Sequence, residues 1–199
     1  MFNFIRYVII VAIIIIMLIL KVKYKWKDKT TLCAIFITIL VCSIFTAFPI
    51  ENVVYKYESP EEVSFYLGNG KPIAFCEGNQ SVLVVYKDDE STHGYFYTAK
   101  KGDGYVLPNS FNSESIVKKV VNDSIIIIDR VKSTNDYYIH VLFNIDVGAD
   151  FVLNDNKNSE FNIYDEKIVS EERVVNCIAC IEYSKDYTLN INGTIVDFD

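Results

Sequence analysis

The chain has 199 residues and a formal net charge of −7 at pH 7, and 51% of its residues are hydrophobic. Residues 1–50 carry six Lys and Arg against one Asp (net +5), whereas residues 51–199 carry 13 against 25 acids (net −12). Such an acidic region excludes nucleic acid and anionic lipid surfaces as expected partners. It is compatible with cationic peptides, with Ca²⁺ or with uncharged partners.

Two apolar runs, at 2–20 and 30–50, flank a segment with five lysines between residues 21 and 29. The second run is uncharged and, at about 1.5 Å per residue, is long enough to cross a hydrocarbon core of about 30 Å. The first run reaches a similar length when Arg6 lies at the headgroups. The expected transmembrane hairpin covers 1–50, with helices at about 4–20 and 31–49 and a cytoplasmic turn at 21–29.

The lysines of this turn also predict the orientation of the chain. Positively charged loops stay in the cytoplasm, so both termini are expected outside it. Lys21 and Lys23 follow the first run where a signal peptide would carry a small-residue cleavage site, so we expect the first helix to be retained. The prediction is a multi-pass cell-membrane protein, integral in the lipid bilayer, with an extracytoplasmic acidic region.

The region after the hairpin has the pattern of a β-rich domain. Residues 51–58 are expected to form a stalk, and Ser59-Pro60-Glu61-Glu62 is typical of a helix start, with Gly68 as its end. Asn192-Gly193 is typical of a type I′ hairpin turn. Short runs rich in Val, Ile, Tyr and Phe predict strands. They lie at 72–77, 81–87, 95–99, 125–131, 137–144, 174–183, 188–191 and 194–198.

These elements predict an α+β to mainly β fold over 59–199, an antiparallel β domain with one short helix. The region is long enough to bury its own core. The sequence leaves open whether it forms one unit or two, with 108–113 as the candidate boundary.

Several of these folding signals resemble those of one group of proteins. They are the helix start at 57–66, the Glu77-Gly78-Asn79-Gln80-Ser81 turn, the Asn135-Asp136-Tyr137-Tyr138 segment and the ending at 189–193. Over most of its length the chain is similar to uncharacterised two-helix membrane-anchored proteins of low-GC Gram-positive bacteria, with an SPEEAF-like helix start in an extracytoplasmic β-rich domain. The resemblance implies the same anchor and fold, and its motifs imply no activity.

Cys177-Ile178-Ala179-Cys180 is the motif with the most obvious chemical potential. A C-x-x-C sequence supports redox chemistry at a helix N-terminus and zinc binding beside a second ligand pair. Here it lies in a predicted strand, where residues three apart point to opposite faces. We interpret these cysteines as structural or buried thiols, and a disulfide that involves Cys76 remains an alternative.

The other candidate motifs lack the additional residues or motifs that catalysis or metal binding requires. His93 and His140 are the only histidines, and neither has a nucleophile and an orienting group assigned to it. Ser115-Ile116-Val117-Lys118 matches S-x-x-K without the other motifs of penicillin-interacting enzymes. The polar run at 154–160 lacks the sharp-turn glycine of a calcium loop. We therefore assign no catalytic, metal-binding or cofactor-binding residue and expect no cofactor.

The sequence favours a non-enzymatic extracytoplasmic binding or sensing module on a two-helix anchor. Aromatic side chains on a β scaffold supply contact area for a partner, here another membrane or envelope protein. The candidate partner-binding residues are Tyr95, Tyr97, Tyr137 and Tyr138.

The sequence is also compatible with two alternative functions. In the first, the chain is a small accessory subunit of a membrane protein complex, packed through Thr38, Cys42, Ser43 and Thr46. In the second, it is an extracytoplasmic hydrolase or thiol enzyme. The identity of the partner and the oligomeric state do not follow from the sequence.

Overall fold

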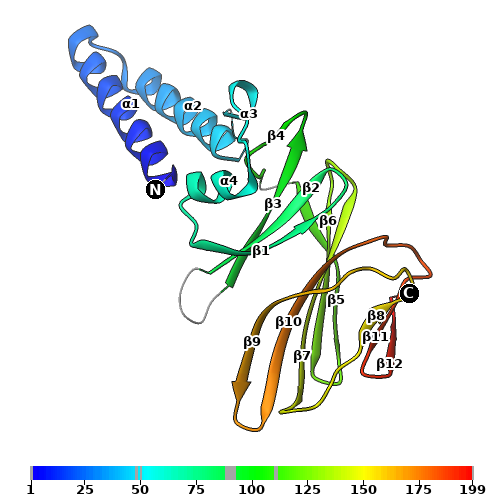
Figure 1. Ribbon diagram of the computed structural model, residues 1–199. Helices are drawn as coiled ribbons and strands as arrows, with labels where there is room; N and C mark the ends of the chain where they lie inside the picture. Colours follow the sequence, from blue (N-terminus) through cyan, green and yellow to red (C-terminus); the bar gives the residue numbers. More distant parts are fainter. Residues whose placement is uncertain (1, 48, 50, 88–92, 110–111, 199) are drawn as a thin grey trace.

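The computed structural model describes residues 2–47, 49, 51–87, 93–109 and 112–198, without the side chains of 2–7, 9 and 45–47. In these residues, a helical hairpin and two short helices precede twelve strands arranged in three sheets (Figure 1). All strand pairs are antiparallel, so the β-rich architecture expected from the sequence is confirmed.

The hairpin consists of α1 (Phe2–Tyr24) and α2 (Asp28–Ala47), which lie side by side and apart from the sheets. The break between α1 and α2 is shorter than the turn predicted at 21–29, because α1 continues through the first lysines. Within this break, only Lys25 adopts a positive φ, of 50°. Lys21 Nζ and Asp28 Oδ1 pair across the break at 2.6 Å. Among the described residues, no helix combines the length and the hydropathy needed to cross a membrane.

The segment expected to form a stalk packs onto the first sheet instead. It begins with a single helical turn, α3 (Glu51–Val54). Tyr57 is buried and exchanges backbone hydrogen bonds with Tyr105 at 2.9 and 2.8 Å. Burial of this aromatic ring fixes the segment that follows α2 against the β-rich region.

The predicted short helix is confirmed as α4 (Pro60–Leu67). The Ser59 hydroxyl accepts a hydrogen bond from the Glu62 amide and so satisfies one of the free donors at the helix start. Gly68 ends the helix in the left-handed conformation at φ 73°, which a residue without Cβ adopts at no cost.

The first sheet is a four-stranded meander beneath α4. Its strand β2 is buried over 81–85, because α4 contacts β1 and β2 on one face and the second sheet packs against the other. Leu83 and Val85 belong to the second contact, together with Ile178. The strands are β1 (Lys71–Glu77), β2 (Ser81–Lys87), β3 (His93–Lys101) and β4 (Gly104–Tyr105), paired in that order.

After the linker at 106–112, a five-stranded and a three-stranded sheet enclose the main core. Phe143, Val175 and Leu189 are among its fully buried side chains. The five-stranded sheet has the order β5 (Ser113–Val121), β6 (Ser124–Val131), β7 (Asp136–Asp146), β10 (Glu172–Ile181) and β9 (Asn162–Val169), and the smaller sheet has the order β12 (Thr194–Asp197), β11 (Thr188–Ile191) and β8 (Leu153–Asp155).

Candidate functional site

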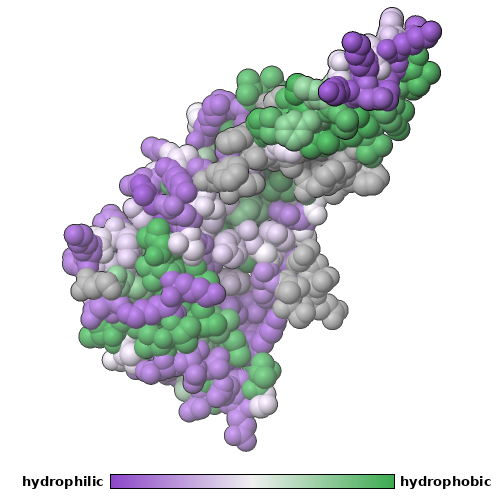
Figure 2. Space-filling view, turned by 180° about the vertical axis from the view of Figure 1, so that it is seen from behind, coloured by the Kyte–Doolittle hydropathy of each residue, from purple (hydrophilic) through white to green (hydrophobic). Residues whose placement is uncertain are grey.

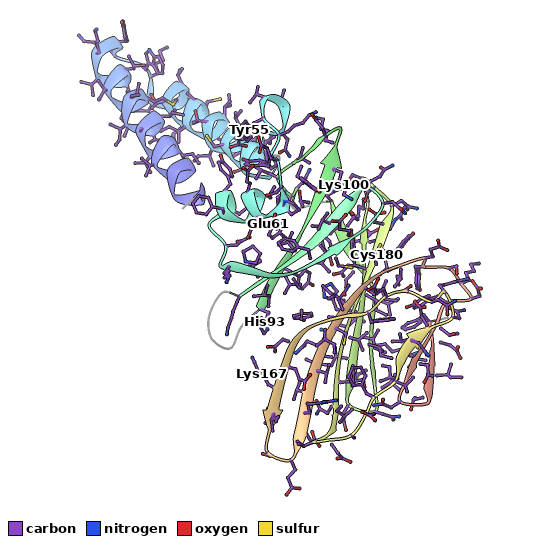
Figure 3. All side chains as sticks on the ribbon, viewed as in Figure 1. Tyr55, Glu61, His93, Lys100, Lys167 and Cys180 are labelled. Carbon is purple, nitrogen blue, oxygen red and sulfur yellow. The ribbon has the colours of Figure 1, made fainter. Side chains whose placement is uncertain are left out.

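Polar and aromatic side chains gather where β3 crosses the five-stranded sheet. His93, Tyr95 and Tyr97 occupy alternate positions of β3 and therefore point the same way. Asp129 of β6 and His140 of β7 face them from the second sheet. We call these five residues the inter-sheet cluster; Figure 3 labels His93 at the end of β3 nearest β9.

At the centre of the cluster, the Tyr97 hydroxyl connects two other side chains in a buried hydrogen-bond network. The Tyr97 hydroxyl donates to Asp129 Oδ2 at 2.5 Å and lies 3.1 Å from His140 Nε2, and all three side chains are buried. Burial and the Asp129 carboxylate raise the pKa of Tyr97 well above its usual value. Burial lowers the pKa of His140, and the Asp129 carboxylate opposes that shift. The neutral Tyr97 phenol thus lies between the Asp129 carboxylate and the His140 imidazole and contacts both.

This chemistry supports a structural network better than a catalytic one. A phenol with a raised pKa is a poor nucleophile at neutral pH. His140 Nε2 is 3.7 Å from Asp129 Oδ2, too far for a hydrogen bond, so the carboxylate does not orient the ring. Within the described cluster, no serine or cysteine is available for activation by the histidine.

His140 should make the stability of the chain depend on pH. Because its pKa is lowered in the folded state, the unfolded chain takes up the proton first as pH falls below about 6.5. The stabilisation is complete above that pH and is lost as pH falls toward the folded pKa. Urea titrations should show a lower free energy of unfolding at about pH 5 than at about pH 7.5.

The variant His140→Gln should reduce this loss, because glutamine has no titratable group. Replacement of the other histidine, His93→Gln, serves as the matched control and should leave the loss in place. Equal pH dependence in the wild type and His140→Gln would contradict the assignment.

Three of the four predicted tyrosines meet at this junction. Tyr138 is fully buried and stacks on Tyr97 at a centroid distance of 5.2 Å. Tyr95 is 45% exposed and covers the His140 ring at 4.5 Å. Tyr137 lies on the other face of β7, where it packs against Tyr183 at 5.5 Å. Tyr95 is therefore the predicted residue with the largest area open to a partner.

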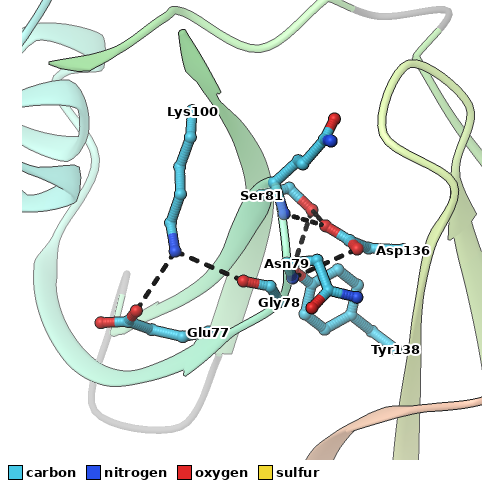
Figure 4. Close-up of polar contacts among 8 residues, drawn as sticks. Glu77, Gly78, Asn79, Ser81, Lys100, Asp136 and Tyr138 are labelled. Carbon is cyan, nitrogen blue, oxygen red and sulfur yellow. Dashed lines mark hydrogen bonds and ion pairs between the residues drawn. The ribbon is translucent and has the colours of Figure 1, made fainter. Parts of the chain in front are cut away.

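A second set of polar residues joins the first sheet to the five-stranded sheet, and Figure 4 shows its contacts. The buried Asp136 carboxylate accepts hydrogen bonds from the amides of Asn79 (3.2 Å) and Gln80 (3.0 Å) and from the Ser81 hydroxyl (2.6 Å). The Ser81 and Tyr138 oxygens are 2.9 Å apart. We call these five residues the hairpin clamp. It joins two motifs that lie more than 50 residues apart in the sequence, the Gly-Asn-Gln-Ser turn and the Asn-Asp-Tyr-Tyr segment.

The three cysteines of the β-rich region are free thiols; Cys76 and Cys177 are buried, and Cys180 is partly buried. Cys177 faces the main core, whereas Cys180 points to the opposite face, as the strand pattern predicted, and packs against the cluster that contains Cys76. Burial raises the pKa of Cys76 and Cys177 to about 12 and that of Cys180 to about 11. Thiolate, the reactive form, is therefore scarce at neutral pH.

The remaining sequence motifs have structural explanations. His93 begins β3 and packs edge-on against Tyr164 at 5.8 Å. In the polar run at 154–160, Asp155 Oδ1 accepts from the backbone amides of Lys157 and Ser159 at 3.1 and 2.8 Å, which fixes a tight turn. The described residues contain no group of three metal-ligating side chains.

Comparison of the chain with protein-family models, with curated proteins and with solved structures finds no match. The functional interpretation therefore depends on the geometry of this chain alone.

Proposed function

We propose that the chain is a non-enzymatic binding or sensing module, anchored in the cell membrane by its helical hairpin, with the β-rich region outside the cytoplasm. The observation that carries this proposal is the surface of α1 and α2. Large apolar side chains such as Ile19 (60% exposed) and Phe36 (68% exposed) stay uncovered, whereas the β-rich region closes its own core. Figure 2 shows this apolar surface over the hairpin, with hydrophilic residues at its tip.

Exposed apolar area on this scale is unfavourable in water. Lipid acyl chains would cover both helices, and the lysines at 21–29 would then lie at the headgroups. Positively charged turns stay in the cytoplasm, which directs the acidic residues 51–199 to the other side.

The surface proposed for a partner surrounds Tyr95. The ring rests on the buried network of Tyr97, Asp129 and His140, so little side-chain freedom is lost when a partner binds. The open face of the second sheet continues from it, because Ile127 pairs with His140 and the partly exposed Ile125 lies two residues further along β6. A rigid aromatic residue beside aliphatic area is typical of protein-binding surfaces, and the expected partner is another membrane or envelope protein.

The proposal is tested by photocrosslinking on intact cells. A photoreactive phenylalanine analogue in place of Tyr95 should give a discrete adduct with one envelope protein. The same analogue at Ile195, exposed on the far sheet, is the matched control and should not give this adduct. The absence of an adduct at position 95, or the same adduct at both positions, would contradict the proposed surface.

The two alternative functions have less support. Thr38 and Ser43 donate hydrogen bonds to Ala34 O (2.9 Å) and Ile39 O (2.8 Å) within α2, so neither hydroxyl needs a neighbouring helix, and the Thr46 side chain lies outside the described residues. An enzyme would need a nucleophile beside His140, and the described cluster offers none.

A further inference from the structure

A hollow of about 290 Å³ opens where four parts of the chain meet. Its walls come from α3, the first sheet, residues 106–109 and 112 of the linker, and the turn before β7. Polar and apolar side chains both line it, and the buried Leu107 contributes to its floor. The polar residues of the lining include Asn52, Gln80, Lys100, Lys101, Asn112 and Thr134.

The charge of this hollow is opposite to that of its surroundings. Residues 51–199 contain 25 acidic and 13 basic residues, yet the described lining includes two lysines and no carboxylate. A concave surface of positive sign within an acidic region attracts anions and repels cations. The hollow therefore selects for negative charge.

Hydrogen bonds within the protein hold the walls of the hollow in place without a ligand. The Asn52 side chain donates to Leu107 O at 2.9 Å and accepts from Leu107 N at 2.8 Å, which fixes α3 against the floor. The Asn112 side chain bonds both to the hydroxyl (2.7 Å) and to the amide (3.0 Å) of Ser133, which fixes the linker to the turn. A preformed pocket loses little conformational entropy on binding.

The cationic groups, in contrast, are held weakly. Lys101 Nζ donates to Asn52 O at 3.3 Å, and Lys100 Nζ lies 3.3 Å from both Gly78 O and Glu77 Oε2 (Figure 4). Contacts of this length near the protein surface contribute little to stability. Either ammonium group can exchange its present partner for a ligand oxygen.

We propose that this hollow binds a small hydroxylated organic anion of monosaccharide size, such as a sugar acid. Its volume lies near the lower end of the range of about 300–1,000 Å³ for small-molecule pockets. The lysines provide donors for a carboxylate, and the exposed Gln80 side-chain amide both donates and accepts, as sugar hydroxyls require. The hollow shares Tyr97 with the network beneath Tyr95 but does not include Tyr95 itself, and the proposal stands if the Tyr95 surface binds no partner.

Calorimetric titration of the full chain in detergent micelles tests the proposal. Glucuronate should bind saturably, and glucose and acetate should each bind about tenfold more weakly, because each lacks one of the two recognised features. Lys101→Gln and Gln80→Ala should weaken glucuronate binding about fivefold or more. Both side chains are exposed, so the variants should fold normally. Lys118→Gln, an exposed lysine of β5 outside the hollow, is the matched control and should bind like the wild type.

Three results would overturn the proposal. The first is the absence of saturable glucuronate binding up to about 10 mM. The second is equal affinity for glucose and glucuronate, which would exclude an anion site. The third is unchanged affinity in both Lys101→Gln and Gln80→Ala, which would locate the ligand elsewhere.

Discussion

Replacement of Asp136 by alanine should destabilise the chain by about 3 kcal/mol or more, the largest effect expected from any single polar residue. The carboxylate is 4% exposed and accepts three hydrogen bonds from the turn between β1 and β2. Its removal leaves the buried Ser81 hydroxyl and two partly buried backbone amides without their acceptor. A buried donor without a partner loses its hydration and gains nothing in return.

Urea unfolding of the full chain in micelles, followed by far-ultraviolet circular dichroism, measures this effect. Asp150→Ala is the matched control, because Asp150 is exposed and should change the free energy of unfolding by less than about 0.5 kcal/mol. If Asp136→Ala unfolds at the same urea concentration as the control, the hairpin clamp does not stabilise the junction of the sheets.

Replacement of Gly78 by alanine should cost about 1–3 kcal/mol. A Cβ at this position would lie 2.5 Å from the Tyr138 hydroxyl and 2.8 Å from Asp136 Oδ2. Both atoms belong to buried side chains of the hairpin clamp, so neither can move away freely. The glycine is required by close approach between the two sheets, and the same unfolding titration measures its importance.

A double-mutant cycle with Tyr138→Phe separates this steric effect from a general loss of packing. Phenylalanine removes the hydroxyl that the new Cβ would meet, so the double variant should be more stable than the sum of the two single effects predicts. Strict additivity would mean that Gly78 and Tyr138 do not meet in the folded chain.

Local chemistry made some elements predictable from the sequence alone. Ser59, Pro60 and Gly68 define α4 because capping and turn preferences act within a few residues. The same is true of Asn192-Gly193, where both residues adopt the positive φ of a type I′ turn, at 51° and 84°.

The edge strands could not be predicted in the same way. β5 (Ser113–Val121) and β9 (Asn162–Val169) lie at the two edges of the five-stranded sheet, and most of their residues are partly or fully exposed. Lys118, Lys119 and Lys167 interrupt the alternation of apolar and polar residues by which strands are recognised. Pairing with β6 and β10 determines their conformation, and no short window of sequence contains that information.

The contacts of the inter-sheet cluster could not be predicted from short stretches of sequence either. The sequence singled out the tyrosines by residue type, but the contact of Tyr97 with Asp129 and His140 joins strands that lie 32 and 43 residues apart. The alternation of His93, Tyr95 and Tyr97 along β3 is the signal that could have shown that these three side chains share one face.

The inter-sheet cluster and the hairpin clamp also explain how binding could be organised. The clamp fixes the first sheet to the start of β7, and the cluster fixes β3 to β6 and β7. The proposed Tyr95 surface and the anion hollow both lie along this junction, so its rigidity would serve both.

Cysteine labelling on intact cells tests most directly whether the hairpin holds the β-rich region outside the cytoplasm. In a chain with Cys33 and Cys42 replaced by alanine, a membrane-impermeant maleimide should label Val152→Cys, an exposed site in the β-rich region, on intact cells. Lys25→Cys, in the break between α1 and α2, should be labelled only after lysis. Labelling of Lys25→Cys on intact cells, with Val152→Cys protected until lysis, would contradict the proposed topology.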